Sequence, residues 1–321
     1  MRGRKLVLLV VILLAIFTLF WILPIVWAGP TSRGTVPGPT PTPSPVPTLV
    51  PLPEDWEDTL PMKCIGATSL GCIPYTCDDL WGLDLDCAFH WGPSAPNCDG
   101  IKRIVMIREI SHISADLSAF DIALTYNEPN VPNGILHPTI AAIEWHHIEM
   151  EHPHLLLISP AIGLIHLPNC PWKETMPDAT CNWLEDFISE YVKYFGRLPR
   201  IDGLGGHCYS GYGEELVDVC REMVEYLETF IEPLDIRMGI WINEFAPNMW
   251  LPYDRMHQQL KDALFYLNTN DNVVMYGVWN LRTKIWERQN TFWCESRNLT
   301  KYGEIYRDTR VYDIMLPVIT K

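Results

Sequence analysis

The chain has 321 residues with 48% hydrophobic content and a formal net charge of −15, which is enough apolar material for one large or two ordinary globular domains. Only four basic residues and no acidic residue precede Glu54, so positions 54–321 carry 20 basic against 39 acidic side chains. Because this negative field repels phosphate backbones, it excludes nucleic acid as the expected partner and favours a neutral or cationic substrate.

The first 28 residues have the composition of an export signal. Positions 1–5, MRGRK, form a basic n-region, and positions 6–28 follow as 23 residues without a charge, which is long enough to span a bilayer. We expect an uncleaved signal anchor here. The alternative is a cleaved signal peptide, because Val26-Trp27-Ala28 resembles a small-residue cleavage site. In both cases the rest of the chain is extracellular, either tethered to the membrane or secreted.

A proline- and threonine-rich segment at positions 29–53 separates this signal from the rest of the chain. It has nine prolines in 25 residues, favours extended polyproline II and cannot bury a core. We expect a semi-rigid linker that holds a single folded domain, positions 54–321, away from the membrane. The alternative is a Pro-rich motif that binds a partner protein.

All ten cysteines follow the linker. An even number of cysteines in an exported chain predicts disulfides, and five cysteines between Cys64 and Cys98 predict a stapled N-terminal region. Zinc binding is the alternative, but the sequence has no C-x-x-C pair, so we expect neither a metal site nor a cofactor. The pairing of the cysteines stays open.

Short apolar runs alternate with helix-like segments from about Pro61 onward. The runs are nearly continuously hydrophobic, which is typical of a parallel sheet buried on both faces. The clear strand candidates are Ile104–Ile107, Ile122–Tyr126, Leu155–Ala161, Ile201–His207, Met238–Phe245 and Val273–Trp279, and the weaker ones are Lys63–Thr68 and Leu85–Phe89. Amphipathic helices are predicted at His137–Glu151, Ala179–Phe195, Glu214–Ile231 and Tyr253–Leu267.

Eight strands with intervening helices in about 260 residues predict an α/β fold, the (β/α)8 TIM barrel. An open doubly wound sheet is the structural alternative, but the chain lacks the Gly-rich phosphate-binding turn of such folds. Trp91–Ile101 leaves no room for a full helix, and the segments after the first and third strands are also short. We therefore expect an outer helix ring that is incomplete in the N-terminal half, with cystines replacing some of the missing helix packing.

Polar and aromatic side chains follow several predicted strands, at the end where barrel enzymes carry their chemistry. The residues delivered there are His90, Trp91, Asn127, Glu128, His207, Tyr209, Asn243, Glu244, Trp279 and Asn280. Alone, Glu128 fits a turn and Glu244 a structural ion pair. Together they fit glycoside hydrolysis, which needs one carboxyl group to protonate the leaving oxygen and another to attack or to activate water. We expect Asn127 to bind a sugar 2-hydroxyl, and the two tryptophans and the tyrosine to stack on apolar sugar faces.

Three of these segments, TYNEPN, GGHCYS and WINEFAP, resemble in their order the clan A retaining glycoside hydrolases. They are most similar to glycoside hydrolase family 128, the glycosyl hydrolase catalytic core domain of endo-β-1,3-glucanases, over most of the exported domain. The resemblance implies Glu128 as general acid/base, Glu244 as nucleophile and Asn127 as the partner of the 2-hydroxyl. It also implies that His207 and Tyr209 orient the nucleophile or line the sugar subsite.

The resemblance has departures as well. The segment AFHWGP is similar to an N-W-G-P element of the family, with His90 where asparagine is usual and with Trp91 in place. Asn130 stands where the family commonly has an acid, and Cys208 stands where a tryptophan is usual. The loop from His166 to Cys181 resembles a disulfide-closed insertion at the rim of the site. These differences leave the proposed chemistry intact and affect which sugar is bound.

The sequence therefore predicts a monomeric retaining endo-β-1,3-glucanase that binds β-glucan and is secreted or tethered by its N-terminal helix. We expect the carboxyl groups of Glu128 and Glu244 to lie about 5–5.5 Å apart and the pKa of the acid to be raised by its environment. Two alternatives stay open: a cell-surface glycan-binding barrel without turnover, and a clan A glycosidase of different linkage specificity.

Overall fold

The computed structural model describes residues 61–67, 69–70, 72, 74–94, 96–131, 136–163, 182–279, 282–283 and 291–309. Chain contacts divide the molecule after residue 42, and every described residue belongs to the second unit, 43–321. The predicted signal segment (6–28), the linker (29–53), the domain boundary at Glu54 and the loop from His166 to Cys181 lie outside the described ranges. Within those ranges, no helix has the length and hydropathy of a membrane span.

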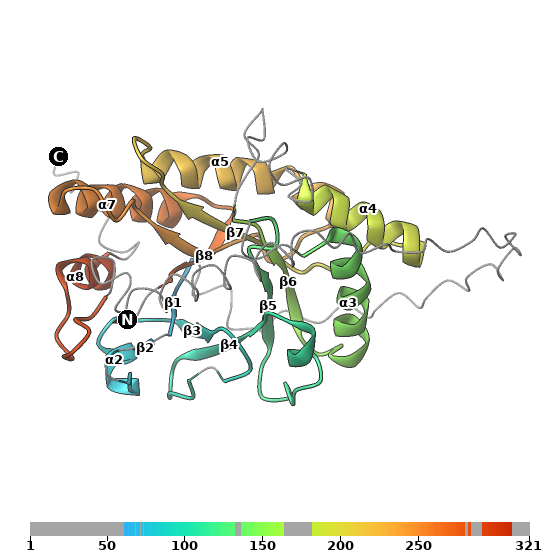
Figure 1. The fold of residues 1–321 in the computed structure, drawn as a ribbon, viewed down its shortest axis with the longest axis horizontal. Helices are drawn as coiled ribbons and strands as arrows, with labels where there is room; N and C mark the ends of the chain where they lie inside the picture. The colour runs from blue at the N-terminus through green and yellow to red at the C-terminus, as the bar shows by residue number, and fades with distance from the viewer. Residues whose placement is uncertain are drawn as a thin grey trace, which may run out of the picture. The chain divides into compact units, whose positions relative to one another are not determined.

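Eight parallel strands form the centre of the fold (Figure 1). They are β1 (Met62–Gly66), β3 (Cys87–His90), β4 (Lys102–Ile107), β5 (Ile122–Asn127), β6 (Leu156–Ala161), β7 (Leu204–Tyr209), β8 (Ile240–Ala246) and β9 (Val273–Val278). Their hydrogen-bonded order is β6-β5-β4-β3-β1-β9-β8-β7. Parallel bridges between Ile158 and Gly203 and between Ile162 and Gly206 join β6 to β7 and close the ring. The predicted barrel is confirmed, and each predicted strand corresponds to one of its eight strands.

Helices cover the barrel unevenly. The helices among the described residues are α2 (Cys77–Trp81), the 3₁₀ turn η2 (Ile110–His112), α3 (Pro138–Glu151), α4 (Trp183–Phe195), α5 (Leu216–Glu228), α6 (Ile231–Leu234), α7 (Tyr253–Thr269) and α8 (Lys301–Asp308). Every strand from β5 to β9 is followed by a helix of at least eight residues, whereas β1, β3 and β4 are not. Figure 1 shows α3, α4, α5 and α7 packed outside the later strands. The incomplete helix ring is therefore confirmed for the described part of the N-terminal half.

The long helices form where the sequence places apolar residues at helical spacing. In α5, the buried residues are Leu216, Cys220, Met223, Val224 and Leu227, which form one face at helical spacing. The predicted helix Glu214–Ile231 is divided into α5 and the short α6. Helix α4 ends at Gly196, whose φ of 69° lies in the left-handed region that glycine adopts without strain.

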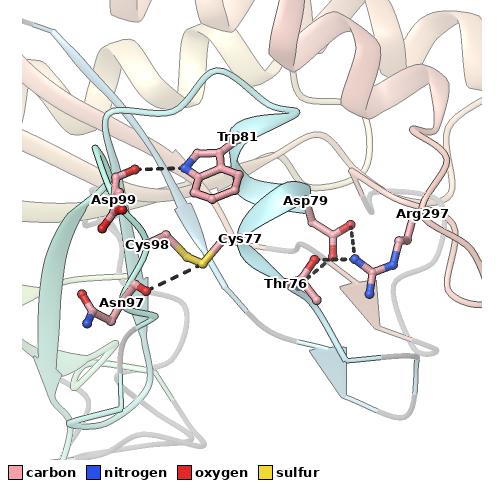
Figure 2. Close-up of a disulfide and its surroundings, with 8 residues drawn as sticks. All are labelled: Thr76, Cys77, Asp79, Trp81, Asn97, Cys98, Asp99 and Arg297. Carbon is pink, nitrogen blue, oxygen red and sulfur yellow. Dashed lines mark hydrogen bonds and ion pairs between the residues drawn. A yellow bond between two sulfur atoms is a disulfide. The ribbon is translucent and has the colours of Figure 1, made fainter.

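Disulfides reinforce the N-terminal half. Cys64–Cys87 joins β1 to β3, Cys77–Cys98 joins α2 to the segment before β4, Cys72–Cys294 ties the segment after β1 to the segment before α8, and Cys208–Cys220 joins β7 to α5. Figure 2 shows the Cys77–Cys98 disulfide and, separately, Arg297, which contacts Thr76 and whose Nη1 atom lies 3.8 Å from Asp79 Oδ1. Three of the four disulfides therefore act where long helices are lacking among the described residues.

The core has an inner and an outer part. Inside the barrel, strand residues such as Phe89, Leu124 and Trp241 pack together. The opposite faces of the same strands pack against the helices, for example Ile242 and Phe245 with residues of α5 and α7. Both faces of each strand are therefore buried, which explains the near-continuous hydrophobicity of the strand sequences.

Candidate active site

The two predicted carboxylates meet at the end of the barrel where the strands finish. Glu128 follows β5 directly, and Glu244 lies within β8. The pairing of β8 with β7 shifts between Gly206↔Ile242 and His207↔Glu244, so Asn243 is passed over. This bulge keeps both Trp241, which packs inside the barrel, and Glu244, which lines the site cavity, on the inner side of the strand.

A similar irregularity turns the end of β5. The pairing of β5 with β6 shifts between Leu124 and Asn127, and two non-glycine residues there have positive φ angles, Tyr126 at 32° and Glu128 at 46°. Non-glycine residues adopt this region infrequently, and they often do so at functional sites. The Tyr126 hydroxyl donates to Glu144 Oε2 of α3 at 2.8 Å, while Glu128 lines the cavity. The irregularity at the end of β5 therefore directs Tyr126 outward to α3 and Glu128 inward to the cavity.

His207 lies between the two carboxyl groups and is fully buried. Its Nδ1 atom is 3.1 Å from Glu128 Oε1 and 3.5 Å from Glu244 Oε2. One carboxyl oxygen of each glutamate and His207 Nδ1 all lie within 4.8 Å of one another. The Tyr209 hydroxyl donates to Glu244 Oε2 at 2.7 Å, and Trp91 Nε1 donates to Glu244 Oε1 at 3.2 Å. Glu244 is thus held by two donors, and Glu128 is held through the imidazole.

Gly163, just after β6, forms the surface against which Glu128 lies. A Cβ atom at this position would sit 2.8 Å from Glu128 Oε1, closer than such atoms approach. The Gly163 amide donates to Asn130 Oδ1 at 2.9 Å, so the loops after β5 and β6 are fastened together. Asn130 is one of the residues that depart from the family pattern, and its side-chain oxygen supplies an acceptor here.

The pKa values of the three groups depend on one another. Burial raises the pKa of Glu128, but the hydrogen bond and the charge of His207 outweigh it and leave that pKa below its ordinary value. Burial raises the pKa of Glu244 above its ordinary value, and His207, Tyr209 and Trp91 offset only part of the rise. Burial alone would lower the pKa of His207, but the charges of both carboxylates raise it. The expected upward shift of the Glu128 pKa is therefore wrong for the free protein, because His207 lies beside this carboxyl group and lowers its pKa.

A cavity of about 460 Å³ opens above these groups. It is lined by Trp91, Asn127, Glu128, Tyr209, Ser210, Glu244, Ala246, Pro247, Asn248, Met249, Trp250 and Trp279. The rings of Trp91 and Trp279 stack with centroids 5.0 Å apart and an angle of 26° between their planes. The cavity thus combines aromatic walls with two carboxylates and two side-chain amides, the composition expected of a sugar-binding cleft.

The structure brings most of the predicted site residues together. Six of them line the cavity, and His207 lies below its floor. His90 lies outside the cavity lining: its Nδ1 atom is 3.2 Å from Ser94 Oγ, and burial lowers the pKa of its ring. Its substrate-binding role stays a prediction, and the position of Asn280 lies outside the described residues.

The loop after β8 supplies site residues that the sequence did not indicate. Asn248, Met249 and Trp250 line the cavity, and 76% of the Trp250 surface is exposed. The sequence signal that could have indicated this loop is the tryptophan of FAPNMW, four residues beyond the end of a strand. Ser210, directly after Tyr209, also lines the cavity and was not predicted.

The second departure from the family pattern lies away from the cavity. Cys208 is between the inward-facing His207 and Tyr209, so strand alternation points it outward. It is fully buried there and forms a disulfide with Cys220 of α5. The disulfide therefore links β7 covalently to α5, and Cys208 does not line the cavity.

The atoms of Glu128, His207 and Glu244 are also a donor set that a divalent cation could use. In the described structure all three groups already interact with one another, and Tyr209 and Trp91 also occupy the Glu244 oxygens. The arrangement can therefore act as a proton-sharing triad directly beneath an aromatic cavity.

Comparison with known proteins supports this picture. Residues 90–306 match the family model described as glycosyl hydrolase catalytic core. No curated protein sequence matches the chain. Three similar solved structures are glycoside hydrolase family 128 enzymes. One is a curdlan-specific exo-β-1,3-glucanase from Blastomyces gilchristii in complex with glucose (17% identity, TM-score 0.57). The others are an endo-β-1,3-glucanase variant from Amycolatopsis mediterranei in complex with laminaripentaose (17%, TM-score 0.59) and an endo-β-1,3-glucanase from Sorangium cellulosum (19%, TM-score 0.58). Each alignment covers 77% of this chain and 98–99% of the other chain, which shows a shared barrel fold.

Proposed function

Because the chain belongs to the glycosyl hydrolase catalytic core family, we propose that it is a retaining endo-β-1,3-glucanase. The observation that carries the proposal is the pair of carboxylates, whose oxygens come within 4.8 Å of each other beneath an aromatic cavity. Retaining glycosidases hold their carboxyl groups about 5–5.5 Å apart, whereas inverting enzymes leave about 6.5–9.5 Å for a water molecule. The close approach therefore favours direct attack by one carboxylate.

In the first step, a Glu244 oxygen attacks the anomeric carbon and forms a glycosyl ester while the bond to the leaving oxygen breaks. Glu128 donates its proton to that oxygen. The Tyr209 hydroxyl and Trp91 Nε1 hold Glu244 in position for the attack. In the second step, Glu128, now ionised, removes a proton from water, the water oxygen attacks the same carbon, and Glu244 leaves as a carboxylate. Two displacements at one carbon retain its configuration.

Glu128 must hold its proton when the sugar is bound, and burial by the substrate can supply the required pKa rise. The Glu128 side chain is 26% exposed, whereas that of Glu244 is 4% exposed. A sugar ring that covers Glu128 removes water from it and favours its neutral form, and Glu244 changes less because it is already buried. We therefore infer that substrate binding moves a proton from the His207 side of the triad to Glu128.

The substrate class follows from the cavity and the charge of the protein. Stacked tryptophans and an exposed Trp250 suit the apolar faces of glucose units, and a negative surface favours a neutral polysaccharide. The family 128 neighbours act on curdlan or bind laminaripentaose, which makes β-1,3-glucan the first substrate to test.

The location of the enzyme is also part of the proposal. The four disulfides among the described residues indicate an oxidising, extracellular setting. We propose that positions 6–28 tether a monomeric barrel to the membrane. Membrane fractionation and size-exclusion chromatography of the detergent-solubilised chain test both points, and recovery of a shortened chain in the medium would contradict the tether.

The activity test uses the full chain in detergent with laminarin, curdlan and a β-1,4-glucan. We expect new reducing ends from the β-1,3-glucans, a mixture of oligosaccharides from an early stage and a β-anomer as the first product by NMR. Release of glucose alone would identify exo action. Binding of the glucans without any new reducing ends would favour the glycan-binding alternative.

A further inference from the structure

We propose that Gln259, on α7, is a positioning residue. Its hydrogen bonds hold the loops after β7 and β8 at the cavity and thereby keep the Tyr209 hydroxyl on Glu244. This inference rests on the proposed hydrolysis. Gln259 is a polar side chain with only 2% of its surface exposed, and its helix neighbours Met256, Leu260 and Ala263 are buried apolar residues. A buried amide in such surroundings is costly unless its hydrogen bonds are made.

The amide of Gln259 makes three hydrogen bonds, all to the region between β7 and α5. Its Nε2 atom donates to the Glu214 carbonyl at 2.9 Å and to Glu215 Oε2 at 3.0 Å. Its Oε1 atom accepts from the Ser210 hydroxyl at 3.3 Å. One side chain on α7 thus holds the loop after β7 at both its start and its end.

Ser210 connects the loop after β7 to the loop after β8. Its Oγ atom accepts from the backbone N–H of Asn248 at 2.9 Å, and Asn248 Oδ1 accepts from the backbone N–H of Trp250 at 2.9 Å. Both Ser210 and Asn248 line the cavity. A continuous chain of hydrogen bonds therefore leads from the buried Gln259 to the exposed aromatic residue at the rim.

The same constraint reaches the proposed nucleophile. Ser210 directly follows Tyr209, whose hydroxyl donates to Glu244 Oε2 at 2.7 Å. Displacing the loop at Ser210 would move the tyrosine ring away from this oxygen, and displacements of the order of 1 Å in catalytic sites reduce rates considerably. Gln259 touches none of the reacting atoms and would act through Tyr209.

The test compares Gln259→Met with Gln258→Met. The first variant removes the three hydrogen bonds at similar side-chain length. The second makes the same change at the adjacent, exposed position, where the amide contacts only Asp262 among the described residues. We expect Gln259→Met to lower kcat about tenfold with little change in KM, and Gln258→Met to leave both unchanged.

A double variant with Tyr209→Phe identifies the route. If Gln259 acts through Tyr209, then kcat of the double variant equals that of Tyr209→Phe alone, and Gln259→Met alone shifts the acidic limb of the pH profile upward as Tyr209→Phe does. The proposal would be overturned if Gln259→Met lowered Tm but left kcat unchanged. It would also be overturned if the kcat loss of the double variant equalled the product of the two single losses. Gln259→Leu, which also removes all three hydrogen bonds, gives the same comparison if the methionine variant does not fold.

Hydrogen exchange gives a readout that does not need activity. Gln259→Met should increase amide exchange in residues 209–216 and 247–252, and Gln258→Met should not. Unchanged exchange in both loops would show that Gln259 does not restrain them and would overturn the proposal. If the wild-type protein hydrolysed no glucan, the proposed function would fail while this measurement would still decide the role of Gln259.

Discussion

The two halves of the barrel are built differently and contribute differently to the site. From β5 onward each strand is followed by a helix, and this half provides both carboxylates, the imidazole and the tyrosine. The half from β1 to β4 has short helical turns among its described residues, is reinforced by three disulfides and contributes Trp91 to the cavity. The half with the long helices therefore carries the reacting groups, and the half with three disulfides supplies one aromatic wall of the cavity.

The largest expected effect concerns the helical half. Glu244→Ala should lower kcat by at least about 10⁴-fold, because the attacking group is removed. Added azide should restore part of the activity and give a product of inverted configuration, which NMR detects. Near-normal turnover in this variant would remove Glu244 from the proposed role, and Glu109→Ala, an exposed glutamate of the other half, serves as the control.

Tyr209→Phe should lower kcat by about tenfold to a hundredfold, because Glu244 loses its shortest hydrogen bond. Glu244 attacks in its ionised form. Burial raises its pKa, and the tyrosine hydrogen bond works against that rise. Removing the hydroxyl therefore raises the pKa further, so the acidic limb of kcat/KM moves to higher pH and the activity loss is greatest below neutral pH. A downward shift of that limb would contradict this account.

Removal of single disulfides tests the division between the halves directly. Replacing Cys77 and Cys98 by serine should lower the free energy of unfolding by about 3 kcal/mol, since the closed loop spans 21 positions, and leave kcat of the folded protein unchanged. The same replacement at Cys208 and Cys220 should cost slightly less stability, because its loop spans 12 positions, but reduce kcat. Urea unfolding and kinetics of both variants measure these effects, and equal kcat values would remove the distinction.

The smallest expected effect is at the rim. Trp250→Ala should raise KM for laminarin about two- to tenfold and leave kcat nearly unchanged, because an exposed ring contributes stacking in ground state and transition state alike. Steady-state kinetics on long and short oligosaccharides provide the measurement. A large fall in kcat would mean that Trp250 helps to place the reacting bond.

The sequence predicted the barrel well because strands buried on both faces leave a clear pattern. The strand runs are nearly continuously apolar up to the polar residues of the site, and the helices α4, α5 and α7 have apolar faces at regular spacing. Helix α3 lacks a clear apolar face, because Ile140, Ile143 and Met150 are exposed on it. Helix α8 was not predicted, because Lys301–Asp308 is short and largely polar, and its buried Tyr302 and Tyr306 reveal their role only by packing.

The carboxylate pair was predicted for the same reason: a glutamate at the end of an apolar strand is conspicuous. What could not be predicted depends on backbone irregularity. The bulges in β5 and β8 determine that His207 reaches both glutamates, and a bulge leaves little trace in a single sequence. The lowered pKa of Glu128 follows from that contact, so it could not be foreseen either. Trp250 belongs to a loop, where periodicity carries no information.

The contact between Gly163 and Glu128 has a consequence for how barrels of this kind could lose their activity. An alanine at position 163 would put a methyl group where the Glu128 side chain lies and would displace its carboxyl group, while the strands and helices stayed in place. Such a variant would keep both acidic residues in its sequence, but its acid/base group would lie elsewhere. The two glutamates alone are therefore not a sufficient sign of activity in a barrel of this kind, and the residue at position 163 has to be read together with them.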